Sequence, residues 1–161
     1  METTMKRPPR SVQRRTYGED ADRALNLLVV LARCSASVGR MSARDIQRYG
    51  LTQAQFCVLE VLHHRGAMPL CMIGEKLLVT GGNVTYVADQ LEKAGLLKRQ
   101  RTSEDRRVIM ARLTSRGAAL MEKCFPEHAE YIAEAAELLT PREQADLARL
   151  LKKWGKAVQA R

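Results

Sequence analysis

The chain has 161 residues, of which 45% are hydrophobic and 28% are charged, and its formal net charge is +9 at pH 7. This length and balance predict one globular domain that buries a core, and they exclude a disordered or fibrous chain. The longest near-continuous apolar run, residues 25–32, is interrupted by Asn26 and followed by Arg33. We therefore expect no membrane-spanning segment.

The four cysteines indicate free thiols and exclude a structural zinc site. Cys34, Cys57, Cys71 and Cys124 form no C-x-x-C pair, and no histidine stands at zinc-ligand spacing from a pair of cysteines. The basic N-terminus has no apolar segment directly behind it, so a secretory signal is not expected. We expect a cytoplasmic protein with reduced thiols, no metal and no cofactor.

The positive charge is confined to two segments. Residues 1–16 contain five basic residues and one acidic residue, and residues 96–116 contain seven basic and two acidic residues. Residues 17–95 and 117–161 are each neutral. A solvated surface would spread the excess more evenly, so this distribution indicates a polyanionic partner, of which nucleic acid is the commonest.

The N-terminal part of the chain predicts an arm followed by helices. Residues 1–19 include the basic segment, lack apolar periodicity and are interpreted as a disordered basic arm. An apolar helix is expected from about Asp20 to Arg40, because its leucines, valines and alanines are dense enough for burial on most sides. A shorter helical piece, residues 43–49, ends at Gly50.

Three short helices follow between residues 52 and 95. Thr52 and Gln55 form a capping box that opens a helix ending at Gly66, and Pro69 is expected in the first turn of the next helix. Thr80 is a suitable N-cap for the third helix, and Gly95 caps its end. The apolar residues of these helices follow the spacing of a buried face and are Phe56, Leu59, Leu62, Leu70, Ile73, Leu77, Val84, Val87, Ala88 and Leu91. Two short helices joined by a tight turn, with a polar outer face on the second, form a helix-turn-helix.

The basic segment alternates like a β-hairpin. Residues 97–101 and 108–113 have strand composition, and the residues between them are polar. A hairpin placed directly after the second helix of a helix-turn-helix is a wing. Together with the charge distribution, it predicts a winged helix-turn-helix that binds DNA.

The last third of the chain is predicted to be helical again. One apolar stripe runs to Pro126 and resumes at Ile132, and Thr140 and Glu143 form a second capping box before a closing helix. The closing helix carries Leu147, Leu150, Leu151, Trp154 and Val158 on one face. The first and last helices therefore need a partner, and we expect a second copy of the chain; in the alternative, all these stripes pack within a monomer.

These elements resemble the MarR family of bacterial transcription regulators. The resemblance covers residues 20–160, and its most specific part is Asp105-x-Arg107 followed by Leu113-Thr114, the wing signature of the family. The segments "RCSASV", "GNVTYVADQLE" and "CFPEHAEYI" are similar to the branch that includes the MhqR regulators, which is associated with sensing quinones and related aromatic electrophiles.

The resemblance implies a mainly α fold with a small β-hairpin wing. It further implies one MarR-type domain over residues 20–161, in which 20–50 and 115–161 form dimerisation helices and 52–114 form the winged helix-turn-helix. The dimer would address a pseudo-palindromic operator in double-stranded DNA, most simply as a repressor. Effectors in such proteins bind between the dimer interface and the winged helix, and the effector-binding residues here are unknown.

Twelve residues are candidates for DNA contact. Those at the start of the predicted recognition helix are Thr80, Gly81, Gly82, Asn83, Thr85 and Tyr86. Asn83 is suited to an adenine edge, and the helix start is suited to phosphate. Those in the hairpin are Lys98, Arg99, Arg101, Asp105, Arg106 and Arg107. We expect Asp105 to orient Arg107 toward the minor groove and the other cations to contact phosphate; alternatively, the wing is only a solvated loop.

Other functions are weaker alternatives. Peroxide-sensing members of the family use a cysteine near the start of the first helix, where this chain has none around Asn26. Cys34 or Cys71 could still react with an electrophile, whereas Cys57 and Cys124 lie in or beside apolar stripes. Adjacent His63 and His64 are interpreted as packing or pocket-edge residues, because on a helix they point in different directions and cannot easily share one metal. No catalytic constellation stands out, so we expect no enzyme. A nonspecific architectural DNA-binding protein would need a broader basic surface.

Overall fold

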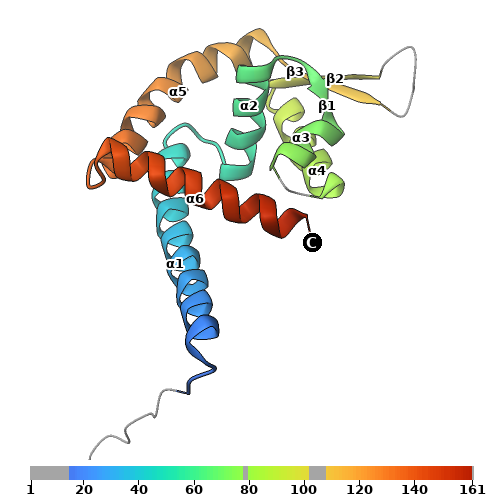
Figure 1. Cartoon of the computed structure of the whole chain (residues 1–161). Coiled ribbons are helices and arrows are strands. Elements are labelled where there is room, and N and C mark those ends of the chain that lie inside the picture. The colour runs from blue at the N-terminus through green and yellow to red at the C-terminus, as the bar shows by residue number, and fades with distance from the viewer. Residues whose placement is uncertain (1–14, 78–79, 102–107, 161) are drawn as a thin grey trace, which may run out of the picture. The chain divides into compact units, whose positions relative to one another are not determined.

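The computed structural model describes residues 15–77, 80–101 and 108–160. The chain divides into two units, Met1–Gly39 and Arg40–Arg161, and the boundary falls inside the first helix. Figure 1 shows the elements, which are α1 (Glu19–Gln47), α2 (Gln53–Arg65), β1 (Met68–Pro69), α3 (Leu70–Leu77), α4 (Gly81–Lys93), β2 (Leu97–Arg101), β3 (Ile109–Leu113), α5 (Ser115–Ala136) and α6 (Pro141–Gln159). The expected mainly α fold with a small β-hairpin is confirmed, while a single domain over residues 20–161 stays a prediction.

Helix α1 is one continuous helix, so the predicted break after Arg40 is wrong. Gly39 lies in open space within the helix, and no proline interrupts the following residues. The end of α1 is where the helix becomes buried: Ser42, Asp45 and Ile46 are covered by other parts of the second unit. This burial favours continued helix, and Gly50, with a positive φ of 71°, turns the chain toward α2.

The capping box of α2 is confirmed, but the predicted place of Pro69 is wrong. The Thr52 hydroxyl accepts the Gln55 backbone N–H at 3.2 Å, and the Gln55 side chain accepts the Thr52 backbone N–H at 2.9 Å. Pro69 lies in a two-residue strand, β1, opposite Met110 of β3, and α3 begins one residue later. Because β1 is an edge strand, the missing N–H of proline breaks no ladder inside the sheet.

The three strands form one antiparallel sheet in the order β1-β3-β2. The hairpin pairs Leu97 with Leu113 and Arg101 with Ile109, which confirms the predicted pairing of these two segments. Leu97 and Ala111 are buried, whereas Lys98 and Arg112, which face each other across the hairpin, are exposed. The sheet therefore has one face toward the core and one toward solvent.

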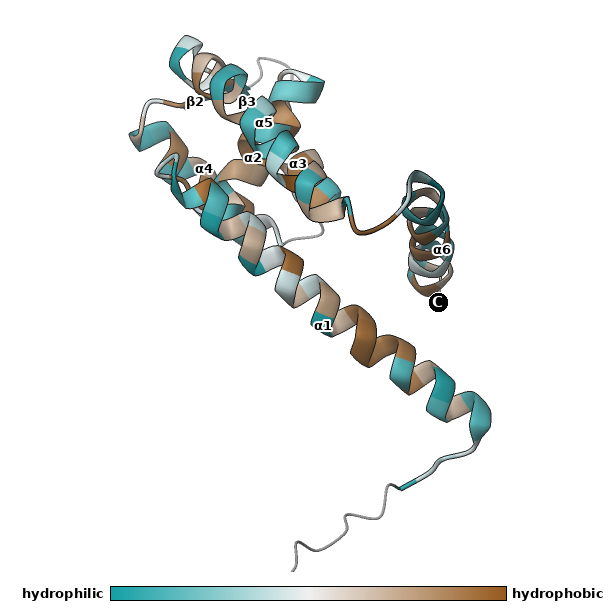
Figure 2. Cartoon of the chain, turned by 90° about the vertical axis from the view of Figure 1, so that its left-hand side faces the viewer, coloured by the Kyte–Doolittle hydropathy of each residue, from teal (hydrophilic) through white to brown (hydrophobic). Residues whose placement is uncertain are grey.

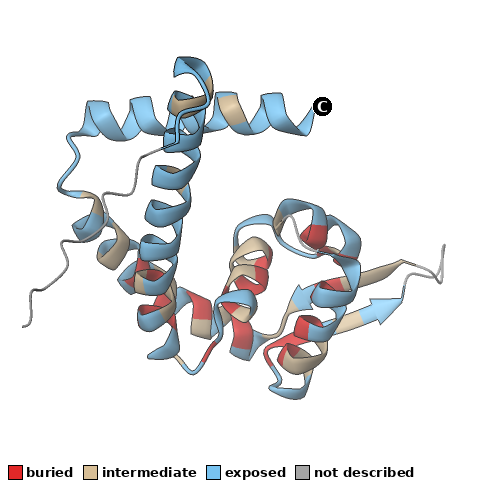
Figure 3. Ribbon diagram, turned by 90° about the horizontal axis from the view of Figure 1, so that it is seen from below, coloured by how far each residue is buried: buried red, intermediate tan, exposed pale blue. Residues whose placement is uncertain are grey.

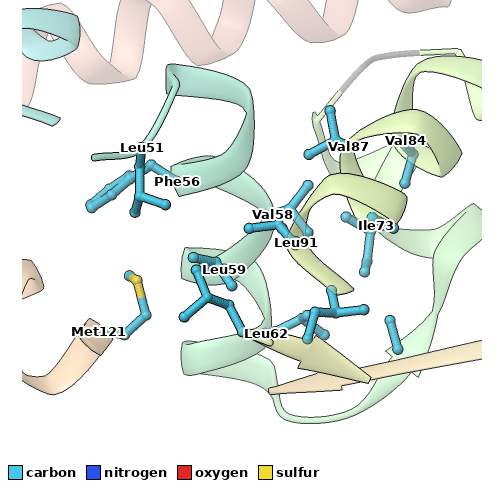
Figure 4. Close-up of a cluster of buried hydrophobic side chains, with 14 of the residues drawn as sticks. Leu51, Phe56, Val58, Leu59, Leu62, Ile73, Val84, Val87, Leu91 and Met121 are labelled. Atoms are coloured by element: carbon cyan, nitrogen blue, oxygen red, sulfur yellow. The ribbon is translucent and has the colours of Figure 1, made fainter. Parts of the chain in front are cut away.

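The core of the second unit lies among α2, α3, α4, the sheet and α5 (Figure 4). The face of α4 that was predicted to be buried is confirmed, because Val84, Val87, Ala88 and Leu91 are each at most 7% exposed. They belong to one cluster with Phe56 and Leu59 of α2, Ile73 of α3 and Met121 of α5. Burial of this cluster determines which face of α4 points outward.

The start of α5 is tied to the chain between α4 and β2. The Thr114 hydroxyl donates to the Gly95 carbonyl at 2.7 Å and accepts the Gly117 backbone N–H at 3.0 Å. Gly95 has a φ of 70°, and the Leu96 N–H then bonds to the Leu91 carbonyl at 2.9 Å, which closes α4. A Cβ at Gly117 would lie 2.0 Å from the Leu96 carbonyl oxygen, so only glycine fits here. The contacts of Thr114 and Gly117, which follow the wing in sequence, therefore fix the position of the hairpin relative to the end of α4.

Helix α5 continues through Pro126, where the apolar stripe was predicted to be interrupted. The stripe is buried on both sides of the proline, at Cys124 and at His128. Helix α6 begins with the predicted capping box: the Glu143 N–H donates to the Thr140 hydroxyl at 3.3 Å, and the Thr140 N–H donates to the Glu143 carboxylate at 2.8 Å.

The outermost helices carry their apolar residues on exposed surfaces. No residue of α6 is buried, and Figure 3 shows α6 exposed along most of its length. Figure 2 shows apolar residues gathered midway along α1, where Leu25, Leu27, Leu28, Val29 and Val30 are each 44–55% exposed. By length and composition alone α1 is apolar enough to cross a membrane, since an 18-residue window has a mean hydropathy of 1.3. Length and composition do not test whether α1 spans a membrane, so the expectation of no membrane-spanning segment stays a prediction. Arg33, in the middle of α1, would be costly in a bilayer and favours a protein partner.

We predict that Gly117→Ala destabilises the fold by about 1–3 kcal/mol, because its methyl group would overlap the Leu96 carbonyl. Ser115→Ala, in the same helical turn but exposed, is the control and should change stability by less than about 0.5 kcal/mol. Chemical denaturation of both variants measures the difference. Equal midpoints for Gly117→Ala and the wild type would contradict the close approach.

Candidate nucleic-acid interface

The outer face of α4 gathers the residues that were predicted to contact DNA. Thr80, Gly81, Gly82, Asn83, Thr85 and Tyr86 are all exposed, and Tyr86 is 64% exposed despite its aromatic ring. They alternate with the buried residues Val84 and Val87, so core packing turns them outward together. The face is polar, contiguous and at the N-terminal end of a 13-residue helix, where free N–H groups favour an anion.

The start of α4 leaves room for another molecule. Thr80 occupies the N-cap position with extended backbone, but its side chain makes no capping hydrogen bond. Apart from the adjacent residues and the backbone of α4 itself, no described atom lies within 4 Å of where a Cβ would be at Gly81 or Gly82. Packing among the described residues thus gives no reason for these two glycines, which is consistent with close approach by a partner. The Thr85 hydroxyl donates to the Gly81 carbonyl at 2.9 Å and keeps its oxygen lone pairs available.

The described part of the wing places its cations in two different environments. Lys98 and Arg101 are exposed on β2, and Arg112 is exposed on β3. Asp105, Arg106 and Arg107 lie outside the described residues. The expected contact of Arg107 with the minor groove therefore stays a prediction that rests on the sequence.

Arg99 makes ion pairs within the fold, which we expect to compete with its predicted phosphate contact. Its guanidinium reaches Asp89 at 2.5 Å and Glu92 at 2.7 Å, both on α4, and its backbone N–H donates to Glu92 at 2.9 Å. The Arg99 side chain is only 22% exposed. Two carboxylates neutralise its charge, so Arg99 fixes β2 to α4 and is less available to phosphate than the exposed Lys98 and Arg101.

The contacts between Arg99 and Glu92 shift the pKa values of both side chains. The backbone N–H of Arg99, followed by its guanidinium, lowers the pKa of Glu92 below the ordinary 4.5. The hydrogen bond to Glu92 raises the pKa of Arg99. Because the Glu92 pKa is depressed on folding, its contribution to stability is present at neutral pH and is lost as the pH falls through the depressed value.

A second polar cluster joins the end of α1 to α2 and α5, and the sequence did not reveal it. His128 Nδ1 lies 2.7 Å from Asp45 Oδ2, and His128 Nε2 lies 3.4 Å from the Ser42 hydroxyl. The Gln53 amide donates to Ser42 at 3.4 Å, and Arg48 pairs with Asp45 at 2.7 Å. Ser42 makes hydrogen bonds to Gln53 and His128, which lie 11 and 86 positions away in the sequence. Helical periodicity could therefore not predict that these groups meet.

A further hydrogen bond joins the residues just after α1 to α5. The Tyr49 hydroxyl donates to Glu127 at 2.8 Å. Burial and this hydrogen bond raise the pKa of Tyr49 to about 12.

The structure agrees with the interpretation of His63, His64, Cys57 and Cys124 as packing residues. His64 and His63 lie 4.6 Å and 6.0 Å from the Phe125 ring, between ring centroids, so their role as packing residues is supported. Burial raises the pKa of the thiols of Cys57 and Cys124. Cys34 and Cys71 are exposed. Among the residues that the structure describes, no group of histidine, cysteine or carboxylate side chains could hold a metal.

Comparison with known proteins adds a consistent set of relatives. A model of the MarR family matches residues 51–109. The chain is 44% identical to the HTH-type transcriptional regulator YkoM of Bacillus subtilis (strain 168), over 85% of this chain and 89% of that protein. It is 38% identical to the HTH-type transcriptional regulator MhqR of the same organism, over 83% and 92% of the two chains. A crystal structure of a mutant MarR from E. coli in complex with operator DNA is similar, with a TM-score of 0.75, 26% identity and coverage of 84% of this chain and 98% of that chain.

We predict that Arg99 and Arg101, two residues apart on one strand, differ in their effects. Arg101→Ala should reduce the slope of log affinity for DNA against log salt by about 0.9, the value for one phosphate contact, with little effect on stability. Arg99→Ala should leave this slope unchanged and lower the unfolding temperature, because Asp89 and Glu92 lose their partner. Salt titration of DNA binding and thermal unfolding measure the two effects. A slope reduced equally by Arg99→Ala would contradict its internal role.

Proposed function

Because the chain belongs to the MarR family of transcriptional regulators, we propose that it is a dimeric repressor that binds a pseudo-palindromic operator and is released by a small aromatic or quinone-like effector. The resemblance inferred from the sequence is confirmed, and so is its winged helix-turn-helix fold. The family consists of regulators, so the expectation that the chain is not an enzyme is also confirmed. Such a repressor would act in the cytoplasm, where bacterial DNA lies.

The observation that carries the DNA-binding proposal is the exposed polar face of α4. It presents Asn83, Thr85 and Tyr86 outward from a helix whose opposite face is buried. A helix held in this way can enter the major groove, while the exposed cations Lys98 and Arg101 reach phosphates beside it. The related E. coli protein was crystallised with operator DNA, which supports this use of the fold.

The remaining DNA contacts of the proposal come from segments outside the described residues. We assign Arg107 to the minor groove, Asp105 to its orientation and Arg106 to phosphate. The basic segment that precedes Glu19, the first residue of α1, would act as an arm and add further phosphate contacts. The assignments in the wing rest on charge and on the match of Asp105-x-Arg107 to the family pattern, and the assignment of the arm rests on its charge.

We predict that Asn83→Ala weakens binding to the preferred operator by about 1–3 kcal/mol and hardly changes binding to random DNA. An amide that bonds to a base edge distinguishes sequences, whereas an amide at phosphate does not. Fluorescence anisotropy with the two DNAs measures this difference, and the random DNA serves as the control. Equal losses on both would assign Asn83 to the backbone.

The proposed dimer follows from apolar surface that the single chain leaves exposed. On α6, Leu147, Leu150 and Leu151 are 38–52% exposed, and they lie on one face of the helix with Val158. On α1, Leu25, Leu27 and Leu28 are 47–53% exposed. Contiguous apolar surface of this kind marks an interface. In the monomeric alternative, these stripes would pack against each other within one chain. We therefore assign residues 20–50 and 115–161 to dimerisation, with two recognition helices on the order of 34 Å apart.

We predict that Leu150→Glu converts the dimer into a monomer and abolishes tight operator binding, because a carboxylate would be buried in the apolar interface. Lys156→Glu, on the opposite face of α6, is the matched control and should remain dimeric. Sedimentation equilibrium gives the mass of each variant. A dimeric Leu150→Glu protein would place the interface elsewhere.

Release of the repressor by a thiol reaction is the second candidate. The specific observation in its favour is that Cys34 and Cys71 are exposed. Cys71 also lines a cavity with Gly81 and Thr85 at the start of α4, so a bulky adduct there would obstruct the DNA-binding face. Under this alternative, Cys71→Ser would abolish release of DNA by a quinone, whereas under the first proposal release would persist.

A further inference from the structure

The face of α4 that points directly away from the core carries a carboxylate, Asp89. Figure 4 shows the opposite, buried face of this helix, which consists of Val84, Val87, Ala88 and Leu91. Because each residue turns the helix by about 100°, the outermost positions are those of Gly82, Tyr86, Asp89 and Lys93. Tyr86 is 64% exposed, and the Asp89 side chain is 41% exposed. Asp89 therefore lies on the surface of α4 that the proposed function turns toward DNA, although the sequence did not single it out.

A carboxylate on this surface is unexpected, because the phosphates of DNA repel it. The structure offsets this repulsion with Arg99, whose guanidinium lies 2.5 Å from Asp89 Oδ1. The ion pair also restricts the Asp89 side chain, so less conformational entropy is lost when it contacts a partner. The charge of Asp89 is thus partly compensated and its position is fixed before DNA binds.

Anchoring of Arg99 alone does not explain Asp89, because Glu92 already fulfils that role. Glu92 Oε2 accepts from Arg99 Nε at 2.9 Å and from Arg99 Nη2 at 2.7 Å, and Glu92 Oε1 accepts the Arg99 backbone N–H at 2.9 Å. Glu92 therefore uses both of its oxygens on Arg99. Asp89 meets Arg99 through Oδ1, and its second oxygen, Oδ2, lies outside this ion pair as a further acceptor.

The chemistry of a carboxylate limits which base it can contact, because its oxygens only accept hydrogen bonds. In the major groove, cytosine presents its N4 amino group as a donor, whereas guanine and thymine present acceptors. Adenine has an N6 amino group, but its acceptor N7 lies beside it. A carboxylate is repelled by these acceptors, so cytosine is the base that fits.

We propose that Asp89 recognises a cytosine in each half-site, with Oδ2 accepting from the N4 amino group while Arg99 holds Oδ1. The inference rests on the proposed function, because it requires α4 to enter the major groove. Asp89 follows Asn83 by six residues, which corresponds to about 9 Å along the helix axis. Since successive bases are about 3.4 Å apart, the cytosine is expected about two to three base pairs from the base that Asn83 contacts.

The first test uses the operator that the full-length wild type selects from random double-stranded DNA, in which both half-sites should carry this cytosine. Two modified operators then carry 5-methylcytosine or thymine there; these bases share the methyl group and differ in the group at position 4. The wild type should bind the 5-methylcytosine operator as tightly as the selected operator, and the thymine operator about tenfold more weakly. Absence of a cytosine preference, or equal binding of the two modified operators, would overturn the proposal.

The second test separates base contact from the anchoring of Arg99 by comparing Asp89→Asn with Glu92→Gln. Each substitution removes one of the two carboxylates paired with Arg99 and keeps an oxygen that can accept from it. Asp89→Asn should reduce the preference for cytosine over the other bases about fivefold or more and shift it toward adenine, which an amide can contact. The preference assigned to Asn83 should persist, and Glu92→Gln should retain both preferences. An unchanged preference in Asp89→Asn, or the same loss in Glu92→Gln, would leave Asp89 as an anchor alone.

The outcomes also distinguish this inference from the proposed function. If the wild type selects an inverted repeat but Asp89→Asn retains the cytosine preference, the inference fails while the proposed repressor stands. If the wild type selects no sequence, both fail. Thermal unfolding verifies that the variants are folded; for an unfolded Asp89→Asn, the comparison of the 5-methylcytosine and thymine operators with the wild type decides.

Discussion

Burial of one face of α4 is the constraint on which the rest of the DNA-binding surface depends. Val84, Val87, Ala88 and Leu91 join residues of α2, α3 and α5 in one core, so the rotation of α4 about its axis is fixed by packing. Every polar residue of the helix start then points outward as a consequence. A protein built in this way needs no separate interaction to orient its recognition residues, because the hydrophobic core already does so.

The wing is positioned by polar contacts that complement this core. Arg99 connects β2 to Asp89 and Glu92 on α4, and Thr114 connects the end of β3 to the Gly95 carbonyl. Gly117 allows the start of α5 to lie against the Leu96 carbonyl. Together these contacts hold β2, the end of β3 and the start of α5 against the C-terminal half of the recognition helix.

The buried cluster of Ser42, Asp45 and His128 lies at the end of α1 and links it to the rest of the second unit. It joins the last turns of α1 to α5, and Gln53 extends it to α2. Asp45 is 2% exposed, so its charge must be compensated, and it receives Arg48 and His128 as partners. Removing one partner of a buried charge is strongly destabilising, which makes this the most sensitive polar site at the end of α1.

Local patterns predicted much of this structure, and contacts between distant residues account for what they missed. Thr52 with Gln55 and Thr140 with Glu143 cap their helices as expected, because a capping box involves only neighbouring residues. The buried face of α4 followed from its helical periodicity. By contrast, Pro69 pairs with Met110, which is distant in the chain, in a strand too short to give a pattern. Arg99 looked like any other cation of the wing, and only the fold brings it to Asp89 and Glu92.

Selection of binding sites from a pool of random double-stranded DNA tests the central claim, that a core-oriented α4 in a symmetric dimer recognises sequence. We expect an enriched inverted repeat whose two half-sites are separated by about one helical turn, or about 10 base pairs centre to centre. Replacing Asn83 by alanine should relax the base preference at the same position in both half-sites. A single asymmetric site, or a pool that remains random while the protein still binds DNA, would contradict recognition by a symmetric pair of core-oriented helices.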